Sequence, residues 1–126
     1  MKRTVKIKLT IPAGQTTSAP FSIENCSIWG ILFPAAFDGV GPSISFQTAG
    51  STFSSASPPA SSDFKDAVDT SGAALSVSVQ LDKVVTLAPN TALAQLLASA
   101  AWIRVVASAT QSAARDIYLL GTVDAS

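Results

Sequence analysis

Alternation of apolar and polar side chains is the most regular pattern along this chain. From residue 5 to residue 11 every second position is a branched aliphatic, and lysine or threonine stands between them. From 75 to 80, leucine and valine alternate in the same way with serine and glutamine. A period of two places one set of side chains on each face of a β-strand. Both segments are therefore predicted to be strands with one buried face.

Similar but shorter patterns recur through the rest of the sequence, separated by proline, glycine and serine at turns. The strands predicted in this way cover residues 2–11, 21–25, 27–33, 43–48, 63–68, 74–81, 83–87, 102–107 and 116–123. Many short strands joined by turn signals are typical of sandwiches and barrels. We expect an all-β protein, a two-sheet β-sandwich or jelly roll with at most one short helix.

The one helical candidate is the segment 89–101. Leu93, Leu96, Leu97 and Ala100 recur at helical spacing, and either Asn90 or Thr91 stands where an N-cap residue is needed. Whether the segment 89–101 is a helix or an irregular loop stays open at this point.

A long polar stretch interrupts the strand pattern at residues 49–62, where serine and proline dominate. Loops of this length without structure of their own are uncommon in compact domains and are often either functional or flexible. Phe53 in its middle and the pair Pro58 and Pro59 are candidate contact residues. No shift in composition divides the chain, so residues 1–126 are predicted to form a single domain.

The composition is unusually poor in charge. Only 13% of the 126 residues are charged, whereas 48% are hydrophobic, and the formal net charge is zero. Ordinary soluble domains carry roughly a quarter of charged residues. A surface with so little charge favours a protein that packs against copies of itself or against a partner, so we expect a homo-oligomer or a larger assembly.

The balance of charge also argues against nucleic acid, because phosphate binding needs an excess of clustered lysine and arginine. The basic cluster near the N-terminus holds Lys2, Arg3, Lys6 and Lys8. A solvated strand face is the simplest interpretation of this cluster, and contact with an acidic partner is the alternative. No apolar run reaches the length of about 18 residues that spans a bilayer, and the N-terminus lacks a signal-peptide core, so no membrane partner is expected.

Candidate chemistry is scarce. The chain has no histidine and one cysteine, Cys26, so the usual triads and metal sites cannot be assembled and a buried apolar role is expected for the thiol. Asp63, Asp66 and Asp69 recur at intervals of three, a spacing that does not match a calcium loop. We expect no enzyme activity, no catalytic residue, no cofactor and no metal.

Aromatic residues raise the possibility of a sugar platform. Trp29 and Trp102 lie within apolar strands, where burial in the core is the expected role. Phe37 falls in the loop 35–42 and Phe53 in the polar loop, so these two are predicted to contact a partner.

Several short motifs, taken in their order along the chain, resemble those of small structural proteins of tailed bacteriophages. The motifs are IWGILFPAAF at 28–37, ISFQ at 44–47, FKD at 64–66, WIRV at 102–105, Gln111, and RDIYL at 115–119. Gln111 and Arg115 are expected to fix the last hairpin rather than to contact a partner.

The resemblance implies a β-sandwich or jelly roll that acts as a capsid cement or decoration protein. In that role the protein binds and stabilises the lattice of the major capsid protein on the capsid exterior of the virion, after synthesis in the bacterial host cytoplasm. Lys2, Arg3, Phe37, Phe53, Pro58 and Pro59 are the candidate contact residues. The alternative is a receptor- or glycan-binding module of a phage tail or fibre, which clustered exposed aromatics would favour.

Overall fold

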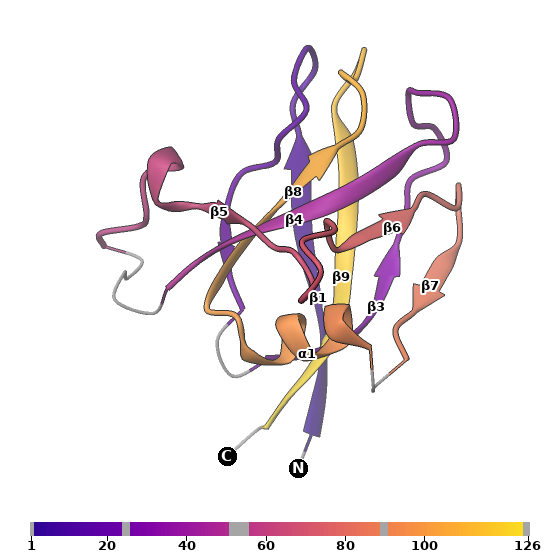
Figure 1. Cartoon of the computed structure of the whole chain (residues 1–126). Helices are drawn as coiled ribbons and strands as arrows, with labels where there is room; N and C mark the ends of the chain where they lie inside the picture. Colours follow the sequence, from indigo (N-terminus) through magenta and orange to yellow (C-terminus); the bar gives the residue numbers. More distant parts are fainter. Residues whose placement is uncertain (1, 24–25, 51–55, 89–90, 125–126) are drawn as a thin grey trace.

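Two antiparallel β-sheets stacked face to face form the body of the molecule, and one short helix lies at the end where the two chain termini meet (Figure 1). This computed structural model describes residues 2–23, 26–50, 56–88 and 91–124. The architecture confirms the prediction of an all-β, two-sheet sandwich with one short helix.

The first sheet has the order β1-β9-β3-β7, and each neighbouring pair is antiparallel. Its strands are β1 (Lys2–Ile11), β9 (Arg115–Asp124), β3 (Cys26–Leu32) and β7 (Val84–Thr86). The first and last strands of the chain pair along ten consecutive positions, from Lys2 opposite Asp124 to Ile11 opposite Arg115. β1 is an edge strand, with a neighbour on one side only.

The second sheet has β8 and β4 at its centre. Its strands are β2 (Phe21–Ser22), β8 (Trp102–Ala107), β4 (Ser43–Ala49), β5 (Lys65–Asp66) and β6 (Ser76–Ser78). The last two strands pair with successive parts of β4, because the chain leaves the sheet between them. In Figure 1, β4 crosses in front of β1 and β9, so the sheets face each other at an angle.

The core fills the space between the sheets. The alternation at the N-terminus correctly predicts the inward face, since Ile7, Leu9 and Ile11 are buried whereas Lys6 and Lys8 are exposed. The other strands also contribute fully buried side chains to the core: Ile31, Ile44, Phe46, Ile103, Val105, Ile117 and Leu119. Burial of these apolar side chains is the main favourable term in folding.

β3 departs from simple alternation at one point. Its pairing with β9 shifts between Ile28 and Gly30, so Trp29 is the extra residue of a β-bulge. The prediction that Trp29 packs in the core is therefore wrong, and its side chain is 42% exposed. Trp102, by contrast, is buried as predicted, with 7% exposure.

Helix α1 (Ala92–Ser99) is shorter than the predicted segment. Thr91 is its N-cap, and the Thr91 hydroxyl oxygen accepts a hydrogen bond of 3.2 Å from the Ala94 N–H. Leu93 and Leu97 are buried against the core, as the helical spacing predicts. Asn90, the other candidate cap, lies outside the described residues.

The segment 74–81 forms only a short strand, although its alternation is the clearest in the sequence. Beyond β6 its main chain bonds to loops: the Leu75 N–H donates to Ala67 O, and the Val79 N–H donates to Pro42 O. Leu75, Val77 and Val79 still face the core, whereas Leu81 at the end of the segment is exposed. The pattern thus predicted the buried face correctly and the length of the regular pairing wrongly.

Gly121 in β9 allows β3 to approach closely. A Cβ atom at this position would lie 2.8 Å from Cys26 Sγ and 2.8 Å from Ser27 O. Cys26 itself is buried as predicted, and burial raises the pKa of its thiol.

We predict that Gly121→Ala destabilises the fold by roughly 1–3 kcal/mol, because the new methyl group overlaps a main-chain oxygen that cannot move aside without breaking the β3–β9 pairing. Gly50→Ala is the matched control, since nothing lies within 4 Å of a Cβ atom there. Urea unfolding of both variants measures the difference, and equal midpoints would contradict the packing described.

Candidate functional site

The outer face of the first sheet carries an apolar surface. Strand register identifies it: Tyr118 on β9 stands opposite Leu32 on β3, and Leu32 stands opposite Val84 on β7. None of these side chains belongs to the buried core, and Val84 is 46% exposed. The bulge residue Trp29 and Leu120 on β9 extend this surface. We call it the outer patch, and it comprises Trp29, Leu32, Val84, Tyr118 and Leu120.

Gly30 lies beneath this patch. It stands opposite Leu120 across the bulge, and a Cβ atom on it would lie 3.4 Å from Val84 Cγ1 and 3.8 Å from Leu120 Cδ1. The two side chains therefore converge over the glycine from neighbouring strands, and the patch is continuous across β7, β3 and β9.

Lysines border the patch on the side of β1. Lys6 stands opposite Leu120 and Lys8 opposite Tyr118, and both lysines are exposed. The Lys6 Nζ atom lies 4.5 Å from the centroid of the Tyr118 ring, an attractive cation–π geometry. The face thus combines an apolar centre with a polar border, and apolar patches rimmed by polar residues often mark protein interaction sites.

On the outer face of the second sheet, the apolar side chains at the end of β4 are instead covered by the chain itself. Phe64 packs there with Ala49 and Trp102 in a second apolar cluster. Arg104 lies over the Phe64 ring, 4.5 Å from its centroid, and donates hydrogen bonds to Ser61 and to the Gln47 side chain. The segment around the 3-10 helix η1 (Ser61–Asp63) is thereby fixed to this sheet. Of the two outer sheet faces, as far as the described residues show, the first sheet's is the open one.

The predicted contact residues are spread over the molecule. Arg3 and Pro58 are exposed, Phe37 is half-buried and packs against the core, and Pro59 is buried. The side chain of Lys2 is not among those described, and Phe53 lies outside the described residues.

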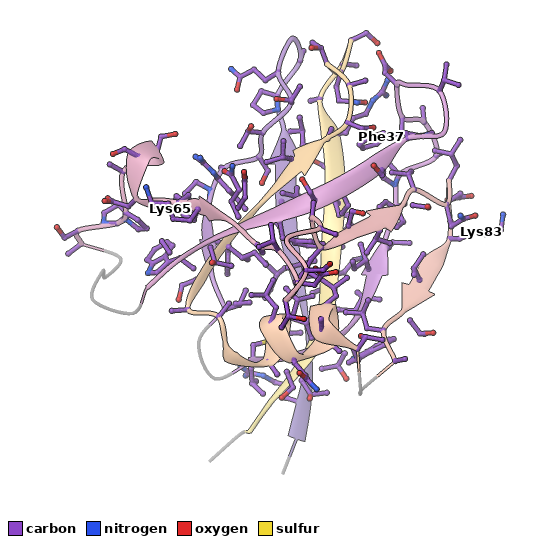
Figure 2. All side chains as sticks on the ribbon, in the orientation of Figure 1. Phe37, Lys65 and Lys83 are labelled. Carbon is purple, nitrogen blue, oxygen red and sulfur yellow. The ribbon has the colours of Figure 1, made fainter. Side chains whose placement is uncertain are left out.

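The structure does not bring these residues together. Lys2 and Arg3 begin β1, whereas the Phe37 loop lies beside the other end of this strand, in the upper part of Figure 2. Ten residues of extended chain span about 30 Å. Phe37 and the N-terminal basic residues therefore cannot share one small site.

A polar network holds the Phe37 loop in place. The Gln111 side chain, which is fully buried, accepts from the Asp38 N–H at 2.9 Å and donates to Asp38 O and Ala109 O. Arg115 forms an ion pair of 2.7 Å with the Asp38 carboxylate. These contacts tie the loop to the β8–β9 connection, which gives Gln111 and Arg115 a role in the fold.

The ion pair makes stability depend on pH. The hydrogen bond from Arg115, with further bonds from Ser112, holds the pKa of Asp38 below its ordinary value. A carboxylate with a lowered pKa in the folded state stabilises the fold at neutral pH, and this contribution disappears as the pH falls from about 4 through the lower folded-state pKa.

We predict that Asp38→Asn lowers the melting temperature at pH 7 and that the difference from wild type shrinks as the pH falls through the lowered pKa of folded Asp38, because the wild-type side chain then becomes neutral in both states. Asp82→Asn, at an exposed turn, is the control and should change the melting temperature little at neutral or at acidic pH. A constant difference between wild type and Asp38→Asn across this range would show that the ion pair is not its cause.

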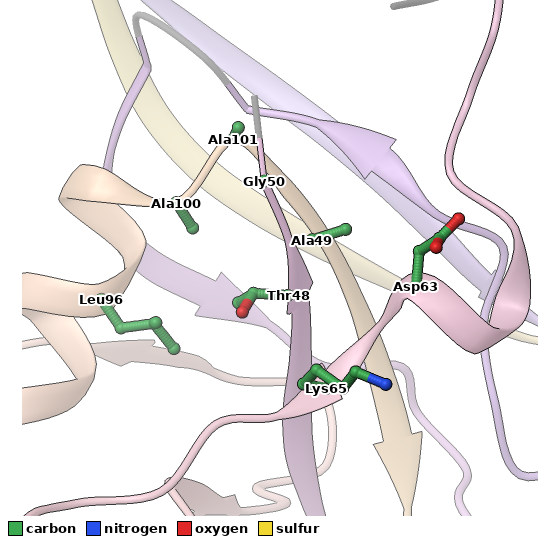
Figure 3. Close-up of a pocket in the computed structure, with 8 residues that line it drawn as sticks. All are labelled: Thr48, Ala49, Gly50, Asp63, Lys65, Leu96, Ala100 and Ala101. Carbon is green, nitrogen blue, oxygen red and sulfur yellow. The ribbon is translucent and has the colours of Figure 1, made fainter. Parts of the chain in front are cut away.

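A shallow pocket of about 450 Å³ lies where β4 ends, between α1 and the segment around η1 (Figure 3). Leu96 and Ala100 form one side, and Asp63 and Lys65 the other. Main-chain groups already bind both charges: the Asp63 carboxylate accepts from the Ala60 N–H at 2.8 Å, and Lys65 Nζ donates to Ser62 O at 3.0 Å. Both charged side chains therefore already have partners within the loop, which they help to hold in place.

The three aspartates spaced by three do not form a cluster. The Asp69 carboxylate organises a turn. It accepts hydrogen bonds from the Ser71 hydroxyl and from the Ser71 and Ala73 N–H groups, and these bonds lower the pKa of Asp69. Asp66 accepts from Gln47. Within the described ranges no group of three His, Cys, Asp or Glu side chains is placed to hold a metal ion.

Comparison with protein-family models, with curated proteins and with solved structures finds no match for this chain. No helix in the described part of the chain is long and apolar enough to cross a membrane. The outer patch therefore stands as the candidate site on its own geometry.

Sequence reasoning did not identify the outer patch. Its signal lies in runs that are apolar at consecutive positions, 28–33 and 117–120, because such runs supply side chains to both faces of a strand. Burial in the core was the prediction for Trp29, and the described residues leave its outer side open.

Proposed function

We propose that this protein is a virion structural protein of the capsid cement or decoration type, which binds the lattice of the major capsid protein through the outer patch. Many copies of the protein, assembled as a homo-oligomer or side by side on the lattice, would each bury this face. Repetition of modest contacts over a symmetric surface gives strong overall attachment.

One observation carries the proposal: the first sheet exposes an apolar patch bordered by lysines, whereas Trp102 and Ala49 on the outer face of the second sheet are covered by Phe64. An apolar sheet face open to water favours association. The low content of charge and the resemblance to small phage structural proteins in the motifs at 28–37 and 115–119 support the same function.

Exposure of Trp29 also favours the second candidate, a receptor- or glycan-binding module of a phage tail or fibre. Trp29 and Tyr118 lie on the same sheet face, and exposed aromatic rings can stack on sugars. The burial of Trp102 removes the other tryptophan from such a platform.

Copy number distinguishes the two candidates. Quantitative mass spectrometry of purified virions encoded by the same genome, normalised to the major capsid protein, should give hundreds of copies in a simple ratio to the lattice. A dozen or so copies would transfer the protein to the tail or fibre, and absence from the virion would refute both candidates.

A pair of matched variants tests the patch itself. We predict that Trp29→Ser weakens binding to capsids lacking the protein by about tenfold or more, because a large aromatic at the centre of an interface often contributes above 1.4 kcal/mol. Phe21→Ser is the control, since Phe21 is 44% exposed but belongs to the second sheet.

Co-sedimentation of each purified variant with capsids over a range of concentrations measures the affinity. Circular dichroism melting shows that both variants are folded before they are compared. Equal loss of binding in the two variants, or none in Trp29→Ser, would contradict the assignment of the patch as the contact face.

A further inference from the structure

The free edge of β1 presents unpaired main-chain groups. The Thr10 carbonyl accepts from the Ala19 N–H at 3.4 Å, so it points away from β9. Main-chain groups of successive residues in a strand point to alternate sides. The N–H and C=O groups of Thr4, Lys6 and Lys8 therefore also point away from β9, toward the open edge.

This edge is long and accessible. β1 has ten residues, and in Figure 1 its beginning projects past α1 together with the end of β9. Among the residues described, Ala19 is the one that bonds to the main chain of β1 from outside the first sheet, and it does so at Thr10. An edge of this kind is a template for the addition of another strand.

Charge selects the strand that fits. Lys6 and Lys8 are exposed on the outer face, and an added strand would place its own side chains directly beside them. Opposite charges at such positions attract, and like charges repel. Next to Lys6, the half-buried Val5 lies at the edge of the core and favours an apolar side chain on the inner face of an added strand.

The same charges disfavour pairing between two copies of β1. An antiparallel pair centred on this segment would place Lys6 opposite Lys6 or Lys8 of the second copy. Lysines on an edge strand are a common device against such self-association.

We propose that β1 accepts an extended segment of the partner, in which acidic and apolar residues alternate, as a fifth strand of the first sheet. The inference rests on the proposed function, which supplies the partner, and deepens it by naming the chemistry of the segment that binds.

A synthetic ten-residue peptide of alternating glutamate and valine serves as the probe, and a peptide of alternating lysine and valine is its matched control. Amide hydrogen exchange of the full chain, followed by NMR, reports which edge is paired. With the acidic peptide at ten times its dissociation constant, exchange at Thr4, Lys6 and Lys8 should slow about tenfold, since only the unbound fraction exchanges. Amides of Val5 and Ile7, which face β9, should change little.

The double variant Lys6→Glu/Lys8→Glu should reverse the preference, so that the lysine peptide binds and the glutamate peptide does not. If this variant does not fold, the two titrations of the wild-type chain still decide. Equal binding of both peptides, or protection at the β7 edge in place of β1, would overturn the inference.

Failure here is distinguishable from failure of the proposed function. If the protein is found on virions at lattice copy number but the acidic peptide does not slow exchange at the β1 amides, strand addition alone is refuted. Protection of β1 by the peptide, together with absence of the protein from virions, refutes the proposed function alone.

Discussion

The pairing of β1 with β9 is the interaction on which the rest of the structure depends. Ten consecutive residue pairs join the first and last strands, so the sheet forms only when the two ends of the chain meet. β3 then pairs with the other side of β9, and Gly121 makes room for that approach. Because the contacts are distant in sequence, folding is expected to be slow compared with that of a helical protein of the same size.

This topology leaves the two sheets in different situations. The segment around η1, between β4 and β5, returns over the outer face of the second sheet, where contacts between Phe64 and Arg104 anchor it. The first sheet receives no such cover from the described residues. Its outer patch and the free edge of β1 belong to the same sheet, so a single partner can engage both. The asymmetry between the two sheets is what supports the proposal of a binding face on the first sheet.

Much of the fold could be predicted from the sequence, because a period of two determines which side chains face the core. The period of two predicted the buried face correctly for β1 and for the inward face of the segment 74–81, where local pattern and tertiary packing agree. It failed at Trp29, since a bulge depends on the register between β3 and β9 and leaves no mark in the residues themselves. The burial of Pro59 and the packing of Phe37 against the core beside the Asp38 network likewise depend on tertiary contacts that the local sequence does not mark.

The candidate site was harder to predict than the fold. Its members come from three strands that are far apart in sequence, and they become neighbours only through the order β9-β3-β7. The basic residues of β1 could be recognised as one face of a strand. Their position at an open edge, which determines the partner that they can bind, follows from the topology alone.

Hydroxyl-radical footprinting of the protein, free and bound on capsids, tests the central claim most directly. Labelling is read by mass spectrometry at Trp29 and Tyr118 on the first sheet and at Phe21 on the second. The account predicts that Trp29 and Tyr118 become protected on the capsid while Phe21 stays as reactive as in the free protein. Protection of Phe21 with undiminished labelling of Trp29 and Tyr118 would contradict it.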